Sequence, residues 1–107
     1  MKFEKIRFER SGGFAGIRLA TEIEAEALPE DQKKEIAELL DDMDFEELPA
    51  KLANRMPLPD EFVYSIVVEF GDQKYEVMAG ESALPGDAQP LIEILEGIAK
   101  QRMRKKD

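Results

Sequence analysis

Acidic side chains crowd the stretch DMDFEE at positions 42–47, and oxygen ligands of this kind are those that calcium prefers. An EF-hand loop needs a glycine at its sixth position and a bidentate acid at its twelfth. Glu47 stands where that glycine would be. We therefore expect solvated acids around a helix cap here, with no bound metal and no cofactor.

A second stretch with possible chemistry is RSGGFAG at positions 10–16. Its glycines do not fit the G-x-G-x-x-G register, and a strand-like run follows it. A phosphate site needs a helix N-terminus aimed at the anion. The helix expected after Pro29 opens with Glu30 and Asp31, which would repel a phosphate. The stretch is instead typical of a hairpin turn, because glycine tolerates positive φ.

The chain contains neither histidine nor cysteine. This excludes a histidine-activated triad, a histidine zinc site, a thiolate nucleophile and a disulfide. Carboxylates remain as acid–base candidates, but no pair of them stands in a recognisable catalytic frame. We expect a protein that is not an enzyme and that acts through the shape of its surface.

Charge and hydropathy narrow the class of partner. The 107 residues include 15 basic and 24 acidic side chains, for a net charge of −9, whereas a nucleic-acid binder needs a basic face. No apolar run approaches the roughly 20 residues that cross a bilayer, and no signal peptide is visible. We expect a cytoplasmic protein without nucleic-acid or membrane partners. The basic stretch 100–106 favours a solvated helix end, with a docking tail for an acidic partner as the alternative.

Periodicity predicts the elements that position these residues. Alternating apolar and polar side chains indicate strands near 3–10, 17–24, 62–70 and 73–79. Apolar stripes of helical period follow near 30–42 and 89–105, and a proline-rich connector with one helical turn lies between 44 and 60. The order ββαββα predicts a single α+β domain over 1–107, with a two-layer arrangement of a four-stranded antiparallel sheet and two amphipathic helices.

The helices would cover one face of this sheet and leave the other face open. The side chains expected on the open face are Arg18, Ala20, Glu22, Val63, Val67 and Met78. The apolar members of this set are suggestive of a partner.

Several stretches together resemble the emfourin family. They are RSGGFAG before the second strand, ALP at 27–29 before the first helix, DDMDFEELPAKL at 41–52, PLPDEFVYSIVVEFGDQKYEV at 57–77 and ALPGDAQPLIEIL at 83–95. Members of this family are small bacterial and archaeal inhibitors of protealysin-like metalloproteases of the thermolysin clan. The resemblance implies a protein that blocks the substrate cleft of a zinc protease. The alternative is a non-catalytic interaction or dimerisation module.

The resemblance also raises the question of which apolar residue would enter the cleft. Leu28 is the first candidate, because a residue before proline is biased to an extended conformation like that of a bound peptide. A packing role against the following helix is the alternative. Phe14 is the second candidate, with a place in the core as its alternative. The protease-contacting residues expected are Ser11, Gly13, Phe14, Glu26, Leu28 and Pro29, with Arg10 beside them in a polar rim. We expect the inhibitor to be a monomer.

Overall fold

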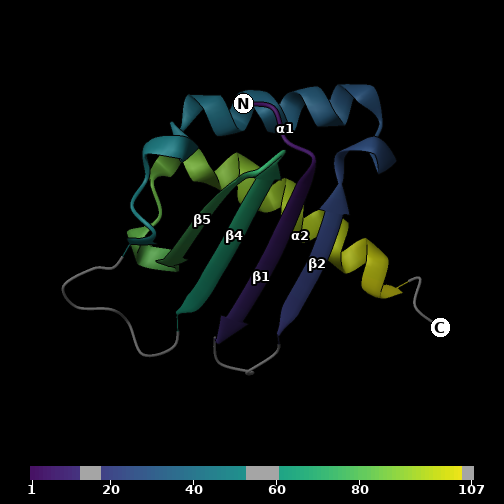
Figure 1. Ribbon diagram of the computed structural model, residues 1–107. Coiled ribbons are helices and arrows are strands. Elements are labelled where there is room, and N and C mark those ends of the chain that lie inside the picture. The colour runs from purple at the N-terminus through teal and green to yellow at the C-terminus, as the bar shows by residue number, and fades with distance from the viewer. Residues whose placement is uncertain (13–17, 53–60, 105–107) are drawn as a thin grey trace.

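The computed structural model describes residues 1–12, 18–52 and 61–104. A five-stranded sheet forms one layer and two helices form the other (Figure 1). The strands are β1 (Lys5–Gly12), β2 (Leu19–Glu24), β3 (Lys51–Leu52), β4 (Phe62–Phe70) and β5 (Gln73–Gly80). The helices are α1 (Glu30–Asp42) and α2 (Gln89–Arg104). The predicted α+β fold and its ββαββα order are confirmed.

The sheet has the strand order β2-β1-β4-β5-β3, and all neighbours are antiparallel except β3 and β5. The two-residue strand β3 is parallel to β5 at the edge and lies in the stretch that the sequence predicted to be only a connector. Two residues are too few to show a period of alternating polar and apolar side chains. The sequence therefore does not predict this strand, which forms by pairing with β5. The main-chain N–H of Met78 donates to the carbonyl oxygen of Ala50 at 2.8 Å.

Four short 3-10 turns complete the structure of the described residues. They are η1 (Ala25–Ala27), η2 (Phe45–Glu47), η3 (Glu81–Ala83) and η4 (Gly86–Ala88). The turn η2 is the helical turn predicted after Asp44. However, Asp44 makes no side-chain capping bond there and instead adopts a left-handed conformation with φ of 49°.

The core lies between the helices and one face of the sheet. The residues at alternate positions of β1 and β4 are buried, as are those on the inner stripes of both helices. The largest fully buried side chains are Ile6, Phe8, Ile23, Ile36, Leu40, Phe45, Val68, Leu91, Ile92 and Leu95. In α2 the buried stripe runs through Leu91, Ile92 and Leu95, while Ile94 and Ile98 are half-buried at its side.

The chain is built from two similar halves. Each half has a strand pair, a 3-10 turn, a leucine-proline step and a long helix, given by β1, β2, η1 and α1 and then by β4, β5, η3 and α2. In the second half the turn η4 lies between the leucine-proline step and α2. Because the central strands β1 and β4 are antiparallel, a half-turn about the sheet normal relates the topology of the two halves. Corresponding connections therefore lie at opposite ends of the sheet.

Candidate functional site

The first end of the sheet carries Leu28. Strand β2 leads into η1, and Leu28 ends this turn in an extended conformation with φ of −96° and ψ of 148°. Its main-chain N–H donates to the carbonyl oxygen of Ala25 at 3.1 Å. Pro29 follows with φ of −57° and ψ of 146° and immediately precedes α1. Proline therefore has the predicted effect on the residue before it.

The side chain of Leu28 is half-buried and packs against the core, whereas Glu26, Ala27 and Pro29 around it are exposed. The N–H of Ala25 donates to the carbonyl oxygen of Glu4 at 2.9 Å, which ties the turn to the start of β1. We name residues 25–29 the Leu28 corner. The corner is a short, anchored turn in which one half-buried leucine lies between exposed neighbours.

The second end of the sheet carries another candidate, Ser11. Ser11 is half-buried on β1 and is paired with Val63 of β4. Gly13 and Phe14 lie outside the described residues. Gly12 adopts φ of 84°, and a Cβ there would come within 3.2 Å of the carbonyl oxygen of Glu61. Glycine is needed at this position for its positive φ and for the close approach of β4.

The structure separates the candidates into two groups. In the β1–β2 register Lys5 faces Glu24 and Arg10 faces Leu19, so the whole of β2 lies between Ser11 and Glu26. A strand of this length spans about 20 Å at roughly 3.3 Å per residue. Ser11 and Glu26 therefore do not lie together around one apolar tip, and only Glu26 and Pro29 accompany Leu28.

Arg10 has a different role from the rim position expected for it. It points to the helix side of the sheet, where its Nη1 lies 2.5 Å from Oε2 of Glu96 on α2. The guanidinium carbon also lies 4.3 Å from the ring centroid of Phe62, a cation–π contact. Only 15% of the Arg10 side chain and 18% of the Glu96 side chain are exposed. The pair joins β1 to α2 at the second end.

The same cluster perturbs Tyr64. Its hydroxyl donates to Oε2 of Glu96 at 3.5 Å. Burial, followed by the negative charge of Glu96, raises the pKa of Tyr64 to about 12. The tyrosine is thus held in its neutral form well above the pH at which an exposed phenol would ionise.

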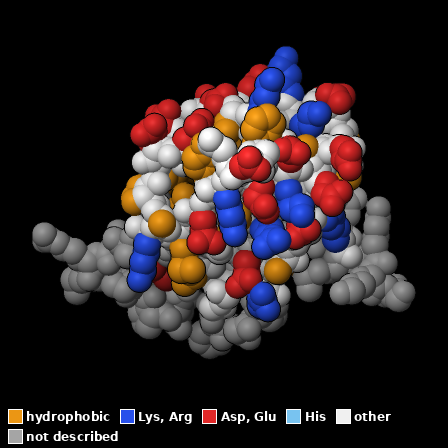
Figure 2. Space-filling view, in the orientation of Figure 1, with side chains coloured by type: hydrophobic (Ala, Val, Ile, Leu, Met, Phe, Trp, Pro, Cys, Tyr) orange, Lys and Arg blue, Asp and Glu red, His pale blue; other side chains and the backbone are white. Residues whose placement is uncertain are grey.

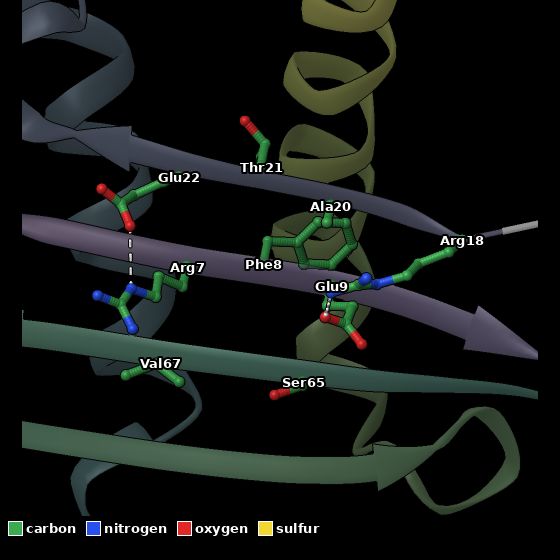
Figure 3. Close-up of a pocket in the computed structure, with 9 residues that line it drawn as sticks. All are labelled: Arg7, Phe8, Glu9, Arg18, Ala20, Thr21, Glu22, Ser65 and Val67. Carbon is green, nitrogen blue, oxygen red and sulfur yellow. Dashed lines mark hydrogen bonds and ion pairs between the residues drawn. The ribbon is translucent and has the colours of Figure 1, made fainter.

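The open face of the sheet bears a hollow of about 360 Å³ (Figure 3). Its floor includes Ala20 and Ser65, and an ion pair stands on either side. Arg18 Nη2 lies 2.6 Å from Glu9 Oε2, and Arg7 Nε lies 3.0 Å from Glu22 Oε2. The residues predicted for the open face are confirmed there, although Val67 is buried.

Charges of both signs are interspersed over this face (Figure 2). A hydrogen bond from Lys5 is the main cause that lowers the pKa of Glu22, and Arg7 adds to the effect. Val63 and Met78 are the large apolar side chains exposed on this face within the described residues, at 37% and 45%. Most charged side chains described on this face are thus paired with one another, and Val63 and Met78 add exposed apolar surface.

The described residues include no group of three or more acidic, histidine or cysteine side chains that could hold a metal ion. No described helix is both long and apolar enough to span a bilayer.

Comparison with family models decides the class of protein. The model of the emfourin family matches residues 8–96. The chain belongs to the emfourin family. This range includes most of β1, all of β2, α1, β4 and β5, and the first half of α2. The comparisons with curated proteins and with solved structures gave no match.

Membership of the emfourin family suggests a role as a metalloprotease inhibitor and is consistent with a protein that is not an enzyme. The structure adds a feature that the sequence interpretation missed. Leucine and proline follow a 3-10 turn at residues 28–29, 48–49 and 84–85. The repeated ALP at 27–29 and 83–85 was the signal that would have revealed two of these corners.

Proposed function

We propose that this chain inhibits a protealysin-like zinc protease by occupying its substrate cleft with the Leu28 corner. The observation that carries the proposal is the emfourin match over residues 8–96. Proteases that resemble thermolysin prefer a bulky apolar side chain just after the scissile bond. Leu28 is the residue of this corner that meets the requirement, and Pro29 and Glu26 beside it would also contact the protease.

The geometry of the Leu28 corner supports the proposal. The extended backbone of Leu28 has the conformation of a peptide in a protease cleft. Hydrogen bonds of the Ala25 and Leu28 N–H groups hold the turn that leads up to Pro29. A corner that is already ordered loses little conformational entropy on binding. Ala27 and Pro29 are exposed on either side of the half-buried Leu28, so a partner can reach the chain here.

Titration of a protealysin-like protease with the chain tests the proposal. The wild type should give a sharp equivalence point at concentrations well above the dissociation constant. Burial of a leucine side chain contributes about 1.5–3 kcal/mol, so Leu28→Ala should weaken protease binding at this corner by roughly tenfold to a hundredfold. Leu48→Ala is the matched control, because Leu48 also ends a 3-10 turn and is half-buried.

A folded Leu28→Ala variant that keeps both the inhibition constant and the equivalence point of the wild type would remove Leu28 from the interface. Far-UV circular dichroism and a thermal melt of each variant identify losses that arise from unfolding. Ser11, Gly13 and Phe14 form the competing set of contact residues, and Phe14→Ala in the same titration decides between that set and the Leu28 corner.

An inhibitor must also survive the protease that it binds. The imide bond before Pro29 and the anchored turn should resist cleavage around residues 27–29. Incubation with a stoichiometric amount of protease, followed by mass spectrometry, should recover intact chain. Prompt cutting at this corner would identify the chain as a substrate.

A second candidate function is favoured by Val63 and Met78 on the open face. These side chains could support a dimerisation or adaptor module. A concentration-dependent dimer without inhibition, measured by analytical ultracentrifugation, would favour this candidate. The monomeric state and the cytoplasmic location expected from the sequence belong to the inhibitor proposal and are tested by the same sedimentation measurement and by cell fractionation.

A further inference from the structure

The corner at residues 81–85 repeats the Leu28 corner closely. We name it the Leu84 corner. The turn η3 precedes Leu84, whose N–H donates to the carbonyl oxygen of Glu81 at 3.4 Å. Leu84 is extended with φ of −69° and ψ of 136°, and Pro85 has φ of −60° and ψ of 148°. The Pro29 angles, φ of −57° and ψ of 146°, are nearly the same.

The two corners also agree in chemistry. Both have the sequence Ala-Leu-Pro, and both leucine side chains are half-buried against the core. Acidic residues flank both corners, with Glu26 and Glu30 at one and Glu81 and Asp87 at the other. A cleft that accepts an extended backbone with one bulky apolar side chain meets a leucine in that setting at either corner, although Ala83 and Pro85 are half-buried whereas Ala27 and Pro29 are exposed.

The corners lie at opposite ends of the sheet. The Leu28 corner follows the end of β2 beside Lys5, whereas the Leu84 corner follows the end of β5, where Gly80 is paired with Val63. The β1–β4 register sets Lys5 against Glu69 and Ser11 against Val63, so most of the sheet's length separates the corners. A protease bound at one corner would leave the other corner on the far side of the inhibitor.

We propose that the Leu84 corner is a second head that enters the substrate cleft of a second zinc protease of the same class. This inference rests on the proposed function of the Leu28 corner. The chain would then be a double-headed inhibitor. Its two similar halves are related by a half-turn, so each places a leucine-proline corner at an opposite end of the sheet.

Native mass spectrometry of the full chain with excess protealysin-like protease tests the proposal. The wild type should form a complex of two proteases with one inhibitor. Leu84→Ala should reduce this complex to one protease, with the first binding constant retained. Leu28→Ala should also give one protease per inhibitor, and the double variant should bind at least tenfold more weakly than either single variant. Leu48→Ala should still bind two.

A second variant avoids changes in the core. Gly86 is exposed, and a Cβ there would meet nothing within 4 Å. Gly86→Trp places a bulky side chain beside Pro85 and should block the second protease while the melting temperature stays the same. A wild-type complex of one to one that Leu28→Ala abolishes would overturn the second head and leave the proposed function standing. A wild type that binds no protease overturns both.

Discussion

The two ends of the sheet hold similar corners by different means. At the first end the support is main-chain, because Ala25 N–H donates to the carbonyl oxygen of Glu4 at 2.9 Å. At the second end it is side-chain, because Glu61 Oε2 accepts bonds from Ser82 Oγ at 2.5 Å and Ser82 N at 3.3 Å. Main-chain bonds survive most substitutions, so the second end should be the more sensitive to mutation.

The glycines of the second end follow from the same support. A Cβ at Gly80 would collide with the carboxylate of Glu61, and Gly12 makes room for the main chain of that residue. The first end carries Gly71 with φ of 59° in the β4–β5 turn, where a Cβ would meet nothing within 4 Å. Glycine is thus needed for space at Gly80, for backbone conformation at Gly71, and for both at Gly12.

The largest effect is expected from the ion pair of the second end. Arg10→Ala leaves Glu96 partly buried without its cation, and the loss of a charge-assisted bond of this kind should lower the free energy of unfolding by about 2–3 kcal/mol. Arg7→Ala is the control, because Arg7 is 54% exposed and exposed pairs contribute at most about 1 kcal/mol. Urea denaturation measures both, and equal losses would contradict the assignment.

The pH dependence of stability tests the same cluster. The pKa of Tyr64 is raised to about 12 in the folded chain, above the value near 10 of an unfolded tyrosine. The neutral phenol therefore stabilises the fold fully below pH 10, and this contribution is lost as the pH rises towards 12. Tyr64→Phe should flatten the decline in stability between these limits. An identical decline in the variant would show that other groups cause it.

A smaller and local effect is expected at Glu61. Glu61→Ala removes both bonds to Ser82 and should cost about 1 kcal/mol, with faster hydrogen exchange of the Leu84 amide. Glu4→Ala is the matched variant, because the Glu4 carboxylate accepts from Gly71 N while its carbonyl oxygen holds Ala25. The Leu28 amide should exchange at an unchanged rate in Glu4→Ala. Faster exchange there would show that side chains support both corners.

The smallest effects are expected from the prolines. Pro29→Ala and Pro85→Ala should each lower stability by about 0.4–1 kcal/mol, because proline fits both native backbones and restricts the unfolded chain. Similar backbone angles at the two positions predict similar losses. Thermal melts of the two variants sharpen the comparison, and clearly unequal losses would mean that the corners differ in strain.

Sequence reasoning succeeded where a pattern is local. Alternation predicted β4 at its observed bounds, and proline chemistry predicted the extended Leu28. The grouping of Ser11 with Glu26 failed because it depends on the length of β2 and its register. Arg10 lies at an even position like Ile6 and Phe8, so the period of two in the strand puts all three on the inner face of the sheet. Its partner Glu96 is distant in sequence and no local pattern points to it.

The C-terminal basic residues show the same limit. The sequence favoured a solvated end for α2, and Lys100 and Gln101 are exposed as expected. Arg102 instead turns back, and its Nη1 donates to Thr21 Oγ1 at 3.2 Å and to the carbonyl oxygen of Glu22. Residues 105–107 lie outside the described part of the chain.

The contact of Arg102 has a consequence for molecules in concentrated solution. Strand β2 is the last strand on its side of the sheet, and a bare terminal strand is a template on which foreign β-structure can grow. The Arg102 guanidinium already donates to the carbonyl oxygen of Glu22, so this acceptor is not available to an added strand. Truncation of the chain before Arg102 would therefore leave the edge strand β2 unprotected and promote fibril formation, even with the hydrophobic core intact.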